Sequence, residues 1–257
     1  MKIAKFFYLI LFLALAVACQ DNEEKARIVV RLTDSPGDYD EVNIDLQDIQ
    51  VHSENGGWRS LDNVNKGIYN LLEFTDGRET VLTSSEYPTG KITQIRLILG
   101  DKNSVEIDED SIPLETPSAQ QSGLKLLLNK ELTSGITYAI LLDFDAARSI
   151  VTTGNGKQIL KPVIKVVSEA QDGAIEGKVL PADLTVAVFA IAGDDTLGTS
   201  YVQPGATDFF VGGLPAGTYK VGFDPGELSG YQKDSLENVV VELGKITQTE
   251  TTELSQD

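Results

Sequence analysis

The chain has very few residues of the types that most enzymes use for covalent or metal-assisted chemistry. Its 257 residues include one cysteine, Cys19, and one histidine, His52. A single cysteine excludes a disulfide within the chain, and a single histidine excludes the HExxH motif and paired-histidine zinc sites. A GxSxG elbow and a P-loop are also absent. Hydrolases of these common types are therefore disfavoured, and we expect His52 to be an exposed residue at a strand end.

Basic residues are scarce as well. Lysine and arginine together number 21 against 39 acidic residues, which gives a net charge of -18. Removal of residues 1–18 would take away Lys2 and Lys5 and leave 19 basic residues, for a net charge of -20. Nucleic acid is therefore an improbable partner, because phosphate binding depends on basic patches. An anionic lipid surface would also repel this chain, and we interpret the acidity as a contribution to solubility.

One long apolar run occurs, at the N-terminus. It spans residues 6–18, follows Lys2 and Lys5, and ends in small residues before Cys19. This arrangement is typical of an export signal, and the run is too short for a transmembrane helix of about 20 residues. Residues 15–19 (Leu-Ala-Val-Ala-Cys) resemble the bacterial lipobox, although Ala16 departs from the usual Leu. We expect cleavage after residue 18 and acylation of Cys19; a plain secretory signal is the alternative.

Residues 20–24 (Gln-Asp-Asn-Glu-Glu) form an acidic stretch directly after Cys19. The stretch looks like the signal that directs lipoproteins of Bacteroides-type bacteria to the cell surface; a solvated linker is the alternative. Several acyl chains on Cys19 would anchor the protein stably. We therefore expect a cell-envelope protein that lipid holds at the outer membrane, exposed at the surface, with residues 19–26 as its tether.

The remaining sequence predicts an all-β protein of two β-sandwich domains, Ig-like or transthyretin-like with Greek-key connections. Short β-rich segments recur between Gly, Pro, Asn and Asp. The first domain, 27–168, has predicted strands at 27–33, 42–51, 68–74, 91–99, 124–128, 138–144 and 158–167. The second domain, 173–257, has them at 184–191, 197–202, 209–211, 218–223, 239–242 and 246–254.

Two local patterns predict details of these strands. In residues 41–52 the apolar positions change parity between Leu46 and Ile49, so a β-bulge near Gln47-Asp48 would keep both sets in the core. A turn with Gly followed by Tyr and an alternating strand occurs twice, at Tyr138 and at Tyr219. We interpret these tyrosines as structural corners that bind backbone.

Several motifs of the first domain resemble the DUF4382 family of bacterial lipoproteins. They are residues 30–36 (Val-Arg-Leu-Thr-Asp-Ser-Pro), 39–44 (Tyr-Asp-Glu-Val-Asn-Ile), 142–150 (Leu-Asp-Phe-Asp-Ala-Ala-Arg-Ser-Ile) and 160–164 (Leu-Lys-Pro-Val-Ile). The resemblance spans roughly 27–167 and implies a β-sandwich and export, without an established activity.

The second domain resembles the carboxypeptidase regulatory-like modules of transthyretin type. Residues 173–179 (Gly-Ala-Ile-Glu-Gly-Lys-Val) open it, and residues 209–219 (Phe-Phe-Val-Gly-Gly-Leu-Pro-Ala-Gly-Thr-Tyr) carry the signature. The resemblance implies a non-catalytic appendage. Because the fold is shared with carbohydrate-binding domains, it also raises sugar binding by analogy alone.

Carboxylates form two clusters whose composition would suit calcium. The first comprises Asp34, Asp38, Asp40 and Glu41, and the second comprises Asp101, Asp108, Glu109 and Asp110. Calcium takes six to eight oxygen ligands of this kind, but neither cluster has EF-hand spacing. In so acidic a chain we prefer to interpret them as turns. No other cofactor is predicted.

A carboxylate-based glycoside hydrolase would use Asp143 and Asp145. They lie on one side of a predicted strand, about 6.6 Å apart from the rise per residue, and this spacing fits the general range for paired carboxylates. Alternation places Leu142 and Phe144 in the core, so hydrogen bonds from these aspartates to backbone are the ordinary explanation.

Aromatic platforms for sugars would need exposed rings. The candidates are Trp58, Phe209 and Tyr231, with Tyr201 and Phe210 as further possibilities; a core position is the alternative for each. Because adjacent strand residues face opposite sides, one of Phe209 and Phe210 should be exposed.

Three hypotheses follow, in order. The first is a non-enzymatic envelope lipoprotein that acts as a binding, adhesion or assembly module through protein contacts. The second is a carbohydrate-binding surface lipoprotein, and the third is a carboxylate-based hydrolase.

Overall fold

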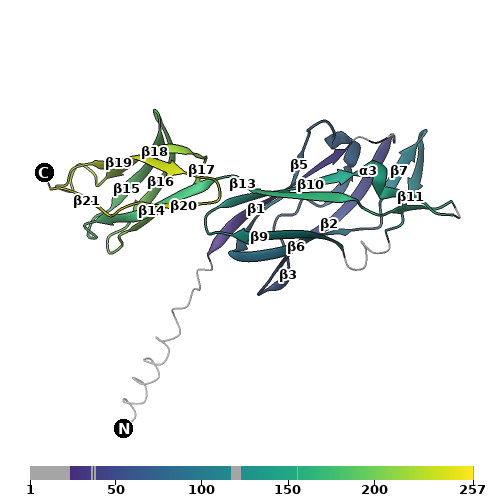
Figure 1. Ribbon diagram of the computed structural model, residues 1–257, viewed down its shortest axis with the longest axis horizontal. Helices are drawn as coiled ribbons and strands as arrows, with labels where there is room; N and C mark the ends of the chain where they lie inside the picture. Colours follow the sequence, from purple (N-terminus) through teal and green to yellow (C-terminus); the bar gives the residue numbers. More distant parts are fainter. Residues whose placement is uncertain (1–23, 36, 38, 117–122, 155, 257) are drawn as a thin grey trace, which may run out of the picture.

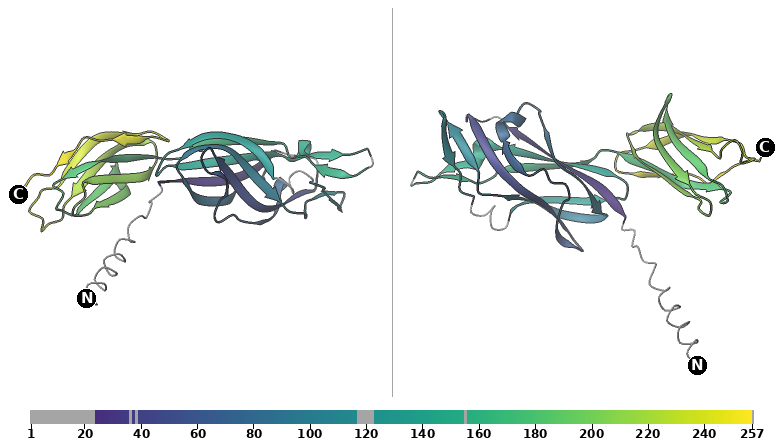
Figure 2. Two further views of the ribbon diagram at one scale, coloured as in Figure 1. Left: turned by 90° about the horizontal axis from the view of Figure 1, so that it is seen from below. Right: turned by 180° about the vertical axis from the view of Figure 1, so that it is seen from behind.

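The computed structural model describes residues 24–35, 37, 39–116, 123–154 and 156–256. Two β-sandwich bodies lie end to end, as Figure 1 and the two further views of Figure 2 show. The predicted all-β class and β-sandwich architecture are confirmed. Each body has its own hydrophobic core, one from Ala26 to Ala174 and one from Ile175 to Leu254.

The N-terminal body consists of two main sheets, in addition to a two-stranded sheet of β11 and β12. One has the order β13-β10-β1-β5 and the other β8-β7-β2-β6-β9, with β3 and β4 also paired to β2. The strands are β1 (Lys25–Ser35), β2 (Glu41–Ser53), β3 (Gly57–Ser60), β4 (Gly67–Asn70), β5 (Thr80–Pro88), β6 (Gly90–Leu99), β7 (Ser104–Ile107), β8 (Asp110–Pro113), β9 (Leu124–Leu132), β10 (Thr137–Asp145), β11 (Ile150–Thr152), β12 (Gln158–Leu160) and β13 (Ile164–Ala170).

Strand β1 lies inside its sheet, between β10 and β5. It pairs in parallel with β10, from Arg27 opposite Thr137 onward, and in antiparallel fashion with β5. Its alternate residues Ile28, Val30 and Leu32 are completely buried. The period of two in the sequence therefore places one side of β1 in the core.

The bulge predicted in β2 is confirmed. The register between β2 and β6 shifts between Leu46 and Asp48. Leu46 and Ile49 are both buried, as the change of parity in the sequence requires.

Two predicted strands of the first body differ from the structure. Residues 68–74 form β4 and then a 3-10 helix, η1 (Leu71–Phe74), because the side chain of Asn70 accepts a hydrogen bond from Leu72 N and caps the turn. Residues 158–167 form β12 and β13 instead of one strand. Pro162 lies in the break, where its missing N–H would interrupt a ladder.

The C-terminal body also has two sheets, ordered β17-β14-β20, with β21 paired to β14, and β16-β15-β18-β19. Its strands are β14 (Gly173–Leu180), β15 (Val186–Ala192), β16 (Asp195–Val202), β17 (Asp208–Leu214), β18 (Gly217–Asp224), β19 (Asp234–Val241), β20 (Ile246–Gln248) and β21 (Thr252–Glu253). Phe209 and Phe223 meet edge to face at 5.5 Å in its core.

The junction between the bodies is short and hydrogen-bonded. Only Gln171 and Asp172 separate β13 from β14. The Asp172 carboxylate accepts from Thr137 N (2.7 Å), and its carbonyl accepts from Gly244 N (2.7 Å). Asp172 therefore binds the N-terminal body through its side chain and the C-terminal body through its backbone.

The two predicted tyrosine corners are confirmed. Tyr219 Oη donates to Pro215 O at 2.8 Å, and Tyr138 Oη accepts from Thr133 N at 3.1 Å. Both tyrosines are 3% exposed. Each hydroxyl therefore holds the turn that precedes its own strand.

We expect Tyr219→Phe to lower the free energy of unfolding by about 1 kcal/mol, because the ring still packs while the Pro215 carbonyl loses its donor. Chemical denaturation measures the change. Tyr201→Phe is the control, since Tyr201 is 63% exposed; equal stability of Tyr219→Phe and the unaltered chain would contradict the corner role.

Candidate functional site

The first predicted calcium cluster is divided between the core and the surface. Asp34 is 5% exposed, whereas Asp40 is exposed and Glu41 is partly exposed. Asp34 Oδ1 accepts from Ala146 N at 3.0 Å, and its Oδ2 is buried without a partner among the described residues. Asp38 and Cys19 lie outside the described residues. No group of three or more His, Cys, Asp or Glu within the described ranges is arranged to hold a metal ion.

Burial raises the pKa of Asp34 from 3.8 to about 6. The negative charges of Asp145 and Asp143 raise it further, while hydrogen bonds from the backbone of Ala146 and Ser35 oppose the rise. Ionisation of the Asp34 carboxyl group is unfavourable because the charged form is not hydrated by water at this buried position.

Part of the second acidic cluster forms a hairpin turn, while Asp101 lies apart in the loop between β6 and β7. Asp108 and Glu109 connect β7 to β8 with φ values of 51° and 67°. A two-residue turn with positive φ is a preferred connection between antiparallel strands. This geometry agrees with the turn interpretation of the sequence.

Asp145, one of the two candidate carboxylates for glycoside hydrolysis, caps a short helix. Its Oδ1 accepts from Arg148 N at 2.9 Å, at the start of α3 (Ala146–Ser149). Its Oδ2 lies 3.6 Å from Arg148 Nη1. Leu142 and Phe144 are buried, as alternation predicts. The carboxylate of Asp145 therefore caps α3 with one oxygen and forms an ion pair with Arg148 through the other.

The aromatic candidates of the second body have different environments. Phe209 is 3% exposed in the core, and the neighbouring Phe210, at 36%, is the outward ring of this strand. Phe210 packs against Gly135 of the first body. Tyr231 is partly buried, and its hydroxyl accepts from Gln256 Nε2 at 2.9 Å. Phe209 is therefore buried and has no exposed surface that a ligand could contact.

Trp58 lies partly exposed on the N-terminal body, where three side chains surround it. The Arg96 guanidinium carbon lies 4.2 Å from the ring centroid and Lys125 Nζ lies 5.9 Å from it. His52 meets the ring edge to face at 5.2 Å. His52 is itself partly buried, and its Nδ1 lies 2.9 Å from Thr93 Oγ1, so the expected fully exposed histidine is not observed.

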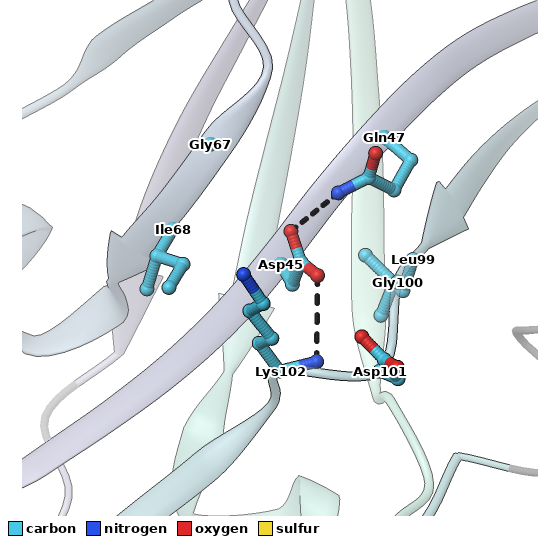
Figure 3. A pocket seen from close by; sticks show the side chains of 8 residues that line it. All are labelled: Asp45, Gln47, Gly67, Ile68, Leu99, Gly100, Asp101 and Lys102. Atoms are coloured by element: carbon cyan, nitrogen blue, oxygen red, sulfur yellow. Dashed lines mark hydrogen bonds between the residues drawn. The ribbon is translucent and has the colours of Figure 1, made fainter.

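A hollow of about 630 Å³ opens beside the middle of β2, and Figure 3 shows its lining. Asp45, 5% exposed, accepts from Gln47 Nε2 (2.5 Å) and from Lys102 N (3.3 Å). Asn103 Oδ1 accepts from Asp45 N at 2.9 Å. These bonds fasten the loop after β6 to β2, so Asp45 has a structural role.

A second hollow, of about 430 Å³, lies on the outer side of the sheet β16-β15-β18-β19. Gly222 on β18 pairs with Phe189 on β15 and leaves this space open. Phe189 and Ile191 supply apolar lining, and Lys220 and Asp224 supply charge. We call the residues Ala187, Phe189, Ile191, Tyr201 and Gly222 the β15 face.

The charges around this hollow are paired. Lys233 Nζ donates to Asp224 Oδ2 at 2.6 Å, and Lys220 lies 2.9 Å from Glu237. The hydrogen bond from Lys233 lowers the pKa of Asp224, and the same bond raises the pKa of Lys233. Both shifts favour the charged forms of these two side chains.

In strand β15 every residue is apolar. Val186, Val188 and Ala190 are buried inward, while Ala187, Phe189 and Ile191 remain partly exposed on the other side. An antiparallel sheet with one solvent-exposed face normally alternates apolar and polar residues along each strand. Tyr201, 63% exposed, extends this apolar surface from the neighbouring strand, where it pairs with Ala187.

Within the described residues, no helix has the length and apolar character needed to cross a membrane. No curated relative matches the chain.

Solved structures with matching segments include three bacterial proteins. The Bacillus anthracis TIE protein is 15% identical, with 91% of this chain and 34% of that chain covered and a TM-score of 0.25. A C-terminal fragment of the pilus adhesin SpaC from Lactobacillus rhamnosus GG is 9% identical (90% and 97%, TM-score 0.25). The minor pilin GBS52 of Streptococcus agalactiae is 12% identical (91% and 96%, TM-score 0.21).

The chain thus spans about a third of the length of the Bacillus anthracis protein. The three TM-scores are too low for these likenesses to support an argument about function.

The family comparison covers the N-terminal body. The family described as Domain of unknown function (DUF4382) matches residues 25–162, more than half of the chain. This match ends before β13 (Ile164–Ala170), which completes the sheet of β1 and β10. The chain belongs to the DUF4382 family.

Proposed function

We propose that the protein is a non-enzymatic, lipid-anchored envelope protein that acts as a binding module in adhesion or assembly. The observation that carries this proposal is the β15 face, an apolar sheet surface in a strongly acidic chain. Exposed contiguous apolar surface with a charged rim is typical of protein interaction sites. In this proposal the C-terminal body is a carboxypeptidase regulatory-like module, and a protein partner covers the β15 face.

Membrane attachment through Cys19 has a direct test. We expect the unaltered protein to partition into the detergent phase of a cell extract and Cys19→Ser to partition into the aqueous phase, because only the acylated form carries lipid. Equal partitioning of both forms would contradict lipidation and leave the binding proposal standing.

We expect Phe189→Ser to abolish partner contact at the β15 face, because the substitution puts a small polar side chain at its centre. A photo-reactive residue at position 201 in the native envelope should form a discrete cross-linked product, and Phe189→Ser should remove it. Because Phe189 is on the outer side of the sheet, this variant should retain the thermal midpoint of the unaltered chain.

A photo-reactive residue at position 68 is the matched control, since Ile68 is 56% exposed on the other body. The proposal fails if positions 201 and 68 give the same products, or if the product at position 201 survives Phe189→Ser.

Carbohydrate binding is the second candidate, and the hollow above Gly222 favours it. Phe189 gives this hollow an aromatic surface and the pair Asp224–Lys233 gives it hydrogen-bonding groups, a combination typical of ligand pockets. A glycan array screened with residues 20–257, which include every strand that the structure describes, should then give binding that Phe189→Ser removes. If no glycan on the array binds, a protein partner remains the supported ligand of the β15 face.

A further inference from the structure

The described part of the chain begins beside the junction of the two bodies and not at either end of the molecule. The carbonyl of Glu24 accepts from Thr89 N at 3.0 Å, and the carbonyl of Lys25 accepts from Gly135 N at 2.8 Å. Gly135 is the residue against which Phe210 of the C-terminal body packs. The two bodies extend in opposite directions from this point, as Figures 1 and 2 show. An anchor upstream of residue 24 therefore holds the molecule near its middle.

Each body is longer than the segment that would join it to the lipid. Strand β2 runs from Ser53, which lines the same hollow as Thr89, to Glu41, about 40 Å away at the usual rise of a strand. Strand β14 runs about 23 Å in the other direction from the junction. Residue 24 follows Cys19 by five positions, which span at most about 18 Å when fully extended.

A molecule anchored in this way cannot stand on either end. With the N-terminal body against the bilayer, residue 24 would lie about 40 Å above the surface, and with the C-terminal body against it, about 23 Å. The chain from Cys19 reaches only about 18 Å. Repulsion between the acidic chain and anionic lipid stretches this segment, but salt screens it beyond about 8 Å. The long axis of the molecule must then lie along the bilayer.

This orientation limits where a partner of the β15 face can be. The face belongs to the C-terminal body, which stays beside the bilayer and does not project toward a distant surface. Residues 173–257 include four lysines, no arginine and 13 acidic side chains, a net charge of -9. A protein that covers the β15 face therefore needs an apolar patch with a basic rim.

We propose that the anchored protein lies along its membrane and that its β15 face binds a protein of that same membrane through an apolar patch with a basic rim. The protein then acts in assembly within one envelope and not in adhesion to another cell. This inference rests on the lipid anchor at Cys19 and on the role of the β15 face proposed above. The experiments below separate failure of the orientation from failure of either.

Three exposed positions mark the middle and the two ends of the molecule. Asn55 lies in the turn after β2, beside the junction. Ser111 lies on β8, which reaches the far end of β2 through β7. Asp183 follows β14 at the far end of the C-terminal body. Asn55→Cys, Ser111→Cys and Asp183→Cys each add one reactive thiol, because lipid occupies the thiol of Cys19 and the chain has no other cysteine.

Energy transfer measures the orientation. The lipidated protein, with a donor dye at one of these positions, is bound to phosphatidylethanolamine-containing vesicles that carry an acceptor lipid. We expect transfer from all three positions, with the highest efficiency at position 55. The two ends lie about 60 Å apart, so loss of transfer at position 111 or 183 alone would show an upright molecule and overturn the proposal. Failure of the protein to float with the vesicles would overturn the anchor and the orientation together.

A lengthened tether is the matched control. Insertion of about 20 Gly and Ser residues between Gln20 and Asp21 adds a flexible span of about 25 Å and leaves both bodies unchanged. Transfer from positions 111 and 183 should fall at least twofold, because the molecule can then rise and tilt. Equal transfer with both tether lengths would overturn the proposal, since the orientation would not depend on the tether.

Mixing two cultures tests where the partner comes from. Cells that carry the photo-reactive residue at position 201 are mixed, before irradiation, with cells that lack this protein and were grown on heavy isotopes. We expect the cross-linked product to contain light partner alone. Heavy partner in the product would show contact between cells and overturn the proposal. Absence of a discrete product would overturn the partner assignment together with the role of the β15 face, while energy transfer decides the orientation separately.

Discussion

Replacing Gly173 with alanine is expected to lower the free energy of unfolding by about 3 kcal/mol or more, because the new methyl group has no space. Gly173 is buried where β14 begins. A Cβ there would lie 2.6 Å from Val241 Cγ1 and far inside van der Waals contact with the carbonyl oxygen of Glu242. A backbone carbonyl cannot rotate away as a flexible side chain can, so β14 must shift.

Thermal unfolding, together with hydrogen exchange of the β14 amides, measures this loss. Gly154→Ala is the control, because nothing lies within 4 Å of the added methyl group and φ is not positive; its stability should equal or slightly exceed that of the unaltered chain. If the β14 amides of Gly173→Ala exchange hydrogen as slowly as those of the unaltered chain, the junction tolerates the methyl group and the prediction is wrong.

Replacing Asp34 with asparagine is expected to raise the free energy of unfolding at pH 7.5 by about 1–3 kcal/mol. The folded chain holds this carboxyl with a pKa of about 6, against 3.8 for the free group, chiefly because burial disfavours its charge. Ionised Asp34 therefore costs stability at neutral pH. Asparagine keeps the acceptor for Ala146 N and carries no charge, although its buried amide N–H groups offset part of the gain.

The pH dependence follows from the same values. Above about pH 6 Asp34 is ionised in both folded and unfolded chains, and the difference between Asp34→Asn and the unaltered chain is at its maximum. Between pH 6 and 3.8 the folded chain binds the extra proton, so the unaltered chain gains stability relative to the variant as pH falls. Below 3.8 the difference is constant.

Denaturation of both chains at several pH values measures this difference directly. Asp40→Asn is the control, because Asp40 is exposed. A difference between Asp34→Asn and the unaltered chain that does not change between pH 7.5 and 4.5 would contradict the raised pKa of Asp34.

Local alternation explains why much of the fold could be predicted. The change of parity between Leu46 and Ile49 is enough to place the β2 bulge, because only a bulge keeps both residues buried. The Gly-Tyr pattern likewise locates the corner at Tyr219. Both predictions depend on residues within a few positions of one another.

The pairing of distant strands could not be predicted in this way. Arg96 meets Lys125 only because a register shift between Ile92 and Gln94 sets the pairing of β6 with β9. A sequence that places these cations 29 positions apart gives no sign of a shared face. The meeting of Arg96 with Lys125 is therefore a property of the tertiary fold.

Two further features have a local signal in the sequence. Asp34 has the same parity as Ile28, Val30 and Leu32, so the alternation that buries those residues also turns Asp34 inward. The uninterrupted apolar run of β15 similarly indicates that both faces of the strand are suited to burial.

The parallel pairing of β1 with β10 has a consequence for how the chain acquires its structure. Arg27 must find Thr137, 110 residues later, before the central ladder of the N-terminal body can close. Such long loop closure slows folding, and β1 remains without its β10 partner until β10 has been synthesised. The first strand of this body is therefore among the last whose pairing is completed, and the incomplete chain exposes an unpaired strand edge until then.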